Sequence, residues 1–290
     1  MVAHRVLHRT GVVCDDARMN PAIWAGIAAL AYSASALALA LHVAGRGPAS
    51  LTTTRVPGLA LATLAIIGHA IALHGQIFFA GALDLGLFQV VSLAGWQIAI
   101  VVVAAGWRLP LASLSVLILP IVAVAAFSPV VLDSSSPRTG IPWQMQAHIL
   151  LSLMAYALLA VAAVHALLLT AQDQHLRQRK PGGWIRALPP LEAMEALLFR
   201  LIGAGFLLLG LSLVTGLLFV DDLFAQHLVH KTVLSIGAWI LFGVLLWGRR
   251  VYGWRGRKAL RWTLAAFLVL LLAYFGSKLV LEVFLGRRWG

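Results

Sequence analysis

The amino-acid sequence predicts an all-α polytopic membrane protein whose transmembrane helices form one bundle. Of its 290 residues, 61% are hydrophobic and only 11% are charged, whereas soluble domains carry about a quarter charged residues. The mean hydropathy of +0.92 means more apolar surface than a soluble globule can bury. Composition therefore excludes the soluble, disordered, collagen-like, coiled-coil and disulfide-scaffold classes.

Eight apolar runs are each long enough to cross a bilayer, which needs about 20 apolar residues in a helix. The predicted spans are residues 20–44, 56–79, 84–106, 109–129, 144–171, 196–220, 230–248 and 260–285. The longest connections, about 129–143 and 172–195, are too short for an independent domain. We therefore expect one membrane domain over residues 19–290.

The charges at the ends of successive spans predict the orientation. The loops after the first, third, fifth and seventh spans carry most of the basic residues: Arg46, Arg55, Arg108, Arg177, Arg179, Lys180, Arg186, Arg249, Arg250, Arg255, Arg257, Lys258 and Arg261. The loops after the second, fourth and sixth spans instead carry the acids Asp84, Asp133, Asp221 and Asp222. Cytoplasmic loops are enriched in Lys and Arg, so we expect the basic loops in the cytoplasm and both termini outside. The net charge of +12 then reflects topology, and we expect no nucleic-acid partner.

Residues 1–18 do not fit this pattern. They lack the apolar core of a signal peptide and carry Arg5, Arg9 and Arg18 on the predicted outer side, where basic residues are disfavoured. We interpret them as a disordered tail or as the product of a mis-assigned start codon. The one cysteine, Cys14, excludes an internal disulfide and a cysteine-rich metal site.

Four histidines from three spans are predicted at one depth near the outer face. His74 lies near the end of the second span, His148 near the start of the fifth, and His227 and His230 at the start of the seventh. Polar groups at membrane depth mark candidate sites, and neutral imidazole is an axial ligand of haem iron. The alternative is that these histidines only hydrogen-bond to loops or lipid headgroups. His165 lies 17 residues beyond His148, about 25 Å deeper, and cannot share its site.

Other polar groups have structural explanations. Residues 148, 152 and 156 share one helical face, and Ser152 is small enough there for close helix packing. Lys278 and Glu282 form an i, i+4 pair in the last span, which we interpret as a structural ion pair. The basic segment 249–258 is explained by topology and by contact with anionic lipid.

Five segments together resemble the CcsA/CcmC-type cytochrome c assembly proteins. They are W-Q-M-Q-A-H-I-L-L-S-L-M-A-Y-A (143–157), the helix 230–250, G-W-R-G-R-K-A (253–259), A-Y-F-G (273–276) and G-L-F-Q-V-V-S-L-A-G-W (86–96). The first resembles the entry to the family's haem-ligand helix. The resemblance covers nearly the whole chain from Met19 and is greatest to the YpjD-like inner-membrane branch.

The resemblance implies an eight-span protein of the bacterial inner membrane that handles haem during cytochrome c maturation. His148 matches the family's first external histidine and would ligate the iron of a non-covalent haem b. The family's tryptophan-rich loop is replaced here by V-D-D-L-F-A-Q-H-L-V-H (220–230), so His230 or His227 would supply the second ligand. Acceptors such as Asp221, Asp222 or carbonyls of that loop would fix each imidazole tautomer.

The resemblance also indicates which partners to expect. They are the lipid bilayer, haem and other membrane proteins of cytochrome assembly. We expect no enzymatic activity, because thioether bonds would form on a separate apocytochrome. Two other functions stay open on the residues alone. One is a transporter or transporter-accessory subunit that uses these polar residues for substrate or proton movement. The other is a quinone-reactive membrane subunit.

Overall fold

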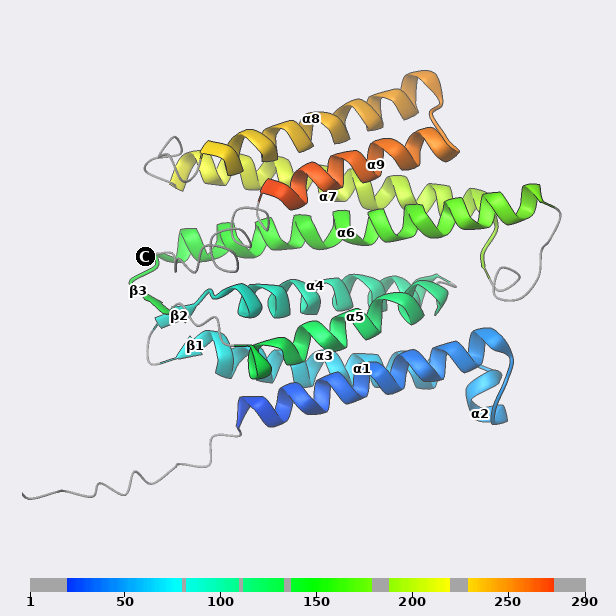
Figure 1. The fold of residues 1–290 in the computed structure, drawn as a ribbon, viewed down its shortest axis with the longest axis horizontal. Coiled ribbons are helices and arrows are strands. Elements are labelled where there is room, and N and C mark those ends of the chain that lie inside the picture. Colours follow the sequence, from blue (N-terminus) through cyan, green and yellow to red (C-terminus); the bar gives the residue numbers. More distant parts are fainter. Residues whose placement is uncertain are drawn as a thin grey trace, which may run out of the picture.

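The computed structural model describes residues 20–79, 82–109, 112–132, 137–178, 188–219 and 229–273. Long helices lie side by side in one bundle (Figure 1). The helices are α1 (Pro21–Ala44), α2 (Ala49–Thr52), α3 (Val56–Ile77), α4 (Leu87–Arg108), α5 (Ala112–Val131), α6 (Trp143–Arg177), α7 (Leu191–Phe219), α8 (Val229–Tyr252) and α9 (Gly256–Leu271). Residues 1–18, with their predicted tail or alternative start, lie outside the described residues.

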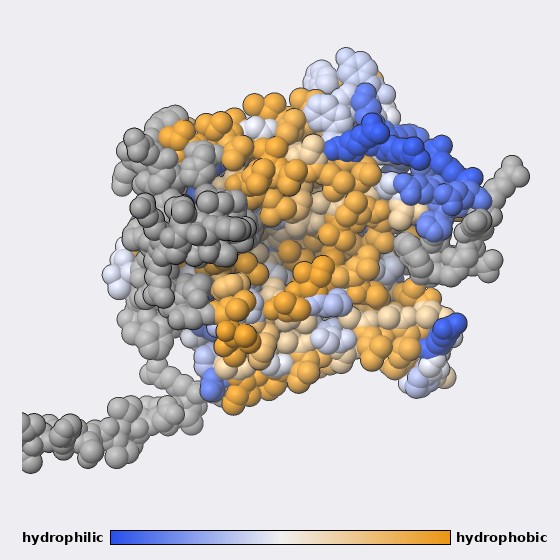
Figure 2. Space-filling model, viewed as in Figure 1, coloured by the Kyte–Doolittle hydropathy of each residue, from blue (hydrophilic) through white to orange (hydrophobic). Residues whose placement is uncertain are grey.

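The predicted membrane spans coincide with these helices. Within the described residues, seven helices are long and apolar enough to cross a membrane, namely α1 and α3 to α8. The eighth predicted span, 260–285, begins within α9 and continues past the last described residue. An all-α polytopic membrane protein is therefore confirmed. Exposed side chains such as Leu30, Val124 and Leu207, each about 70% accessible, give the sides of the bundle the apolar surface that lipid requires (Figure 2).

The first helix shows how local sequence sets the boundaries of a span. The Asn20 side chain accepts a hydrogen bond from the Ala22 amide at 2.9 Å, and Pro21 occupies the first helical turn. Both are favoured at helix starts. The helix ends at Ala44, and the next residue, Gly45, has a φ of 62°, the left-handed conformation that glycine adopts readily.

Three features differ from the predicted spans. α7 begins at Leu191, before the predicted start at residue 196. α6 continues to Arg177 rather than ending at residue 171, because its last turns are polar but still helical. There Arg177 pairs with Asp173 four residues earlier, at 2.9 Å. In addition, the short strands β1 (Phe78–Phe79), β2 (Ala82–Asp84) and β3 (Pro137–Thr139) form an antiparallel sheet. These strands are too short to produce a periodic pattern in the sequence.

The helices pack in two groups that meet between α4 and α6. α1, α3, α4 and α5 form one group and α6 to α9 the other (Figure 1). The sheet and the first turn of α6 lie at one end of the bundle, hereafter the sheet end. The α8–α9 turn, residues 253–255, lies at the opposite end, hereafter the basic end (Figure 1). The last turn of α3 and the first turns of α6 therefore lie at the same end, as the predicted topology requires.

Candidate functional site

His148 lies in the second turn of α6, half-buried against α7. Its Nδ1 atom is 2.9 Å from Thr215 Oγ1. The Thr215 hydroxyl itself donates to the Ser212 carbonyl oxygen at 3.0 Å. Because a hydroxyl has one hydrogen to donate, Thr215 Oγ1 must accept from the imidazole. The proton of the neutral ring is thus on Nδ1, and the lone pair is on Nε2.

The absence of a side chain at Gly216 lets the His148 ring pack closely against α7. The ring lies over Gly216, where an added Cβ atom would be 3.1 Å from Cε1 and 3.8 Å from Nε2. A larger residue at position 216 would press on the imidazole. No hydrogen bond to Nε2 is found within the described part of the chain. An oriented neutral imidazole with a free Nε2 is the form in which histidine binds haem iron.

The predicted face 148/152/156 is a packing seam. Ser152 Oγ donates to the His148 carbonyl oxygen at 2.6 Å and lies 2.6 Å from Ser212 Oγ on α7. Tyr156 donates to the Leu270 carbonyl oxygen on α9 at 3.1 Å. The expectation of close packing at Ser152 is therefore confirmed. The same contacts also fix the helix that carries His148.

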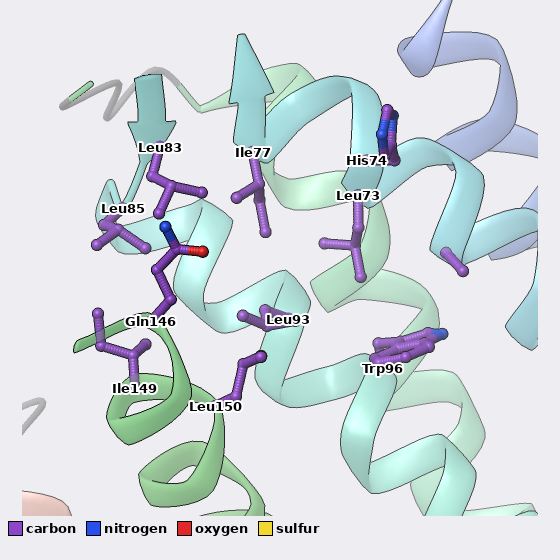
Figure 3. A pocket seen from close by; sticks show the side chains of 11 residues that line it. Leu73, His74, Ile77, Leu83, Leu85, Leu93, Trp96, Gln146, Ile149 and Leu150 are labelled. Atoms are coloured by element: carbon purple, nitrogen blue, oxygen red, sulfur yellow. The ribbon is translucent and has the colours of Figure 1, made fainter. Parts of the chain in front are cut away.

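His74 lies at the same end of the bundle but at a different helix contact. Its exposed side chain is at the edge of an apolar cavity of about 280 Å³ between α3, α4 and α6 (Figure 3). Gln146 of α6 projects toward this cavity, and Trp96 of α4 lines another edge. His148 instead faces α7. The structure thus places His74 and His148 at one end, as predicted, but on opposite sides of the α6 entry.

The other predicted site residues fall mostly outside the described residues. His230 is the second residue of α8, which begins at the sheet end (Figure 1), but its side chain is not described. His227, the acids Asp221 and Asp222, and the Lys278–Glu282 pair lie outside the described residues. The pairing of His148 with His230 or His227 therefore stays a prediction.

The acceptor that fixes the His148 tautomer differs from those expected. The sequence pointed to Asp221, Asp222 and nearby carbonyls, whereas the acceptor is Thr215, six residues earlier. Ser212 and Thr215 interrupt an otherwise apolar run one turn apart. Hydroxyl residues in membrane helices commonly hydrogen-bond across to a neighbouring helix. This pair of hydroxyl residues was the sequence signal from which an acceptor on α7 could have been predicted.

Two deeper histidines have structural roles. His165 is fully buried and donates from Nε2 to the Met194 carbonyl oxygen on α7 at 2.9 Å. His69 is also fully buried, with Nε2 2.9 Å from Ser92 Oγ and Nδ1 3.4 Å from the Tyr32 hydroxyl. This second network joins α1, α3 and α4, and sequence reasoning missed it. Neither histidine contacts His148.

Among the described residues, no group of three or more His, Cys, Asp or Glu side chains could hold a metal ion. A single imidazole such as that of His148 suits a metal ion that a cofactor already holds through other donors. The fold and this site define a polytopic α-helical membrane protein with an oriented imidazole at one end of the bundle.

Comparison with known proteins identifies the family. The family model "Cytochrome C assembly protein" matches residues 59–285. Inner membrane protein YpjD of Escherichia coli K12 is 36% identical over 273 residues, which is 90% of this chain and 98% of that protein. This chain therefore belongs to the cytochrome c assembly protein family.

Further relatives match shorter stretches of the chain. An uncharacterised 28.8 kDa protein of Azospirillum brasilense is 37% identical over 187 residues, 62% of this chain and 67% of that protein. The cytochrome c biogenesis protein CcsA of Chlamydomonas reinhardtii is 26% identical over 144 residues, 48% of this chain and 39% of that protein. No solved structure matches the chain significantly. The resemblance found in the sequence is confirmed.

Proposed function

We propose that this protein binds haem non-covalently at the sheet end and handles it during cytochrome c assembly. His148 Nε2 is one axial ligand, and His230 or His227 supplies the other. The chain catalyses no covalent step, because thioether bonds form on a separate apocytochrome. The observation that carries the proposal is the Nδ1 hydrogen bond from His148 to Thr215, which leaves Nε2 oriented and unprotonated.

The described residues fit one axial position of a haem. Ligating histidines generally donate their other ring nitrogen to an acceptor, which fixes the ring and raises its basicity. Thr215 does this for His148, and Gly216 lets the ring lie against α7 without a steric clash. α8 packs against α7, and α7 is the helix that contacts His148. Bound haem would supply iron with its open axial positions and the apolar porphyrin ring.

The location of the site follows from charge and from family membership. The relative from E. coli is named an inner membrane protein, and we propose the same membrane here. Most of the described Lys and Arg residues lie at helix ends and turns of the basic end, which the positive-inside rule places in the cytoplasm. The sheet end, with His148, then faces outward, where other membrane proteins of cytochrome assembly would receive the haem.

A haemin titration of the detergent-purified protein tests this proposal. Wild type should give a Soret band that saturates near one haem per chain. His148→Ala should weaken haemin binding at least tenfold, because a ligand to iron is lost. His175→Ala is the matched control, since His175 is an exposed residue near the other end of α6 and its loss should change nothing. Failure of wild type to bind haemin, or equal binding by His148→Ala, would overturn the proposal.

A further inference from the structure

The turn between α8 and α9 concentrates positive charge at the basic end. Residues 249–261 contain six Arg and Lys side chains and no acid. Figure 2 shows hydrophilic residues gathered over this corner of the bundle, beside the apolar surface of the neighbouring helices. Topology alone requires positive charge somewhere on this side, but it does not require that the charge be held in one place.

Most of these cations have no acidic partner among the residues that the structure describes. Arg249 and Arg255 share Glu195 of α7, at 3.7 and 3.9 Å. Within the described residues, this is the one carboxylate in ion-pair range of the turn. Four exposed cations thus have none: Arg250, Arg257, Lys258 and Arg261. We call these four residues the cationic patch.

The backbone beneath the cationic patch is held in place by Trp254. The Trp254 amide donates to the Gly248 carbonyl oxygen at 3.2 Å, and its ring packs on Gly248 so closely that a Cβ atom there would be 2.5 Å away. Trp262 lies against the ring at a centroid distance of 5.4 Å. Lys258 Nζ sits 3.8 Å above the ring centroid, a cation–π contact. The patch is therefore preorganised rather than carried on a loose loop.

The position of the patch along the bundle matches a membrane surface. Trp247 and Tyr252, at the end of α8, are 67% and 71% exposed. Exposed Trp and Tyr side chains of membrane proteins gather at the headgroup level. The cations that immediately follow them in the chain therefore lie at the depth of the lipid phosphates.

From this arrangement we propose that the cationic patch is a binding site for anionic phospholipid headgroups. Charge complementarity selects the ligand, because cations without an acidic partner at headgroup depth lie beside the phosphate groups of lipids. Basic clusters at this position attract anionic lipid, and Arg forms two parallel hydrogen bonds to a phosphate group. Bound lipid would stabilise the position of the α8–α9 turn, and with it that of α8. This effect does not depend on haem.

Lipid titrations of the full-length protein in neutral detergent test the proposal. Phosphatidylglycerol should raise the thermal unfolding midpoint, and phosphatidylcholine should not. The variant R250Q/R257Q/R261Q should bind phosphatidylglycerol at least tenfold more weakly, measured by that stabilisation and by native mass spectrometry of bound lipid. The control R46Q/R108Q/R177Q, which removes three positive charges elsewhere at the basic end, should bind as wild type does.

Two further arms separate charge from fold and lipid from free phosphate. R250K/R257K/R261K keeps the charge and should keep most of the binding, which shows that the glutamine variant fails through charge rather than folding. An equal loss of phosphatidylglycerol binding in R46Q/R108Q/R177Q would overturn the proposal that the binding site is local to the cationic patch. Inorganic phosphate at matched concentration should not stabilise the protein. Stabilisation equal to that by phosphatidylglycerol would identify the ligand as free phosphate and overturn the lipid proposal.

Discussion

For His148, the sequence predicts the depth of the residue in the bundle but not the hydrogen bond that sets the tautomer of its ring. Its depth follows from its place near the start of an apolar run, and the structure puts it at the sheet end as expected. Its tautomer depends on Thr215, 67 residues away in the chain. No local pattern encodes such a contact, because it arises only when α6 and α7 pack together. The sequence therefore predicts the ligand but not the partner that orients it.

Replacing Thr215 tests the orienting role directly. Thr215→Val removes the acceptor but keeps the shape, so the imidazole loses its fixed tautomer. We expect haemin affinity to fall about tenfold, the lower range for loss of such a partner. Thr215→Ser restores a hydroxyl and should restore affinity in the same titration. If valine and serine variants bind haemin equally, Thr215 does not orient the ligand.

At the scale of the elements, the close approach of α6 and α7 makes the site possible. Gly205 faces Leu159, and a Cβ atom at Gly205 would be 2.6 Å from the Leu159 side chain. Gly216 faces His148 in the same way, a few turns further along. Small residues at helix contacts let backbones approach closely in membranes. The His148–Thr215 hydrogen bond requires that approach.

A pair of glycine substitutions separates this packing from helix propensity. Gly205→Ala should lower the free energy of unfolding by about 1–3 kcal/mol through overpacking. Gly203→Ala introduces a Cβ with nothing within 4 Å, so it should leave stability unchanged or raise it by up to about 1 kcal/mol. Thermal or denaturant unfolding in detergent measures both. Equal effects of the two substitutions would show that the α6–α7 contact is not tight at Gly205.

The elements themselves were largely predictable, and the exceptions have physical reasons. Each predicted span coincides with a helix within a few residues where the structure describes it, because apolar length is what a bilayer selects. The polar end of α6 extends further, because a helix does not need apolar residues to continue past a membrane span; there Arg177 pairs with Asp173. The sheet at 78–84 and 137–139 was missed, because it joins connections far apart in the chain. The His69 network was missed because it links three separate helices.

At the scale of the whole molecule, the two ends of the bundle have different chemistry. One end carries the sheet and His148, and the other carries the cationic patch (Figures 1 and 2). Haem binding and lipid binding are thus proposed at opposite membrane surfaces. Both assignments to a side of the membrane depend on the orientation that the Lys and Arg bias predicts.

Cysteine labelling in intact cells checks this orientation. In a Cys14→Ser background, Thr139→Cys places a thiol in β3 at the sheet end, and Ser50→Cys places one in α2 at the basic end. An impermeant thiol reagent should modify the first in intact cells and the second only after lysis. The reverse pattern would put His148 on the cytoplasmic side and overturn the proposed outer location of the haem site.

The central claim, that His148 ligates haem iron, is tested most directly by the absorption and electron paramagnetic resonance spectra of haem-loaded His148→Ala. Wild type, with two imidazole ligands, should be low-spin. The variant should lose the low-spin signal, and free imidazole should restore it by occupying the vacated axial position. A His148→Ala protein that keeps the wild-type low-spin spectrum without added imidazole would contradict the assignment and leave His148 as a structural residue of the α6–α7 seam.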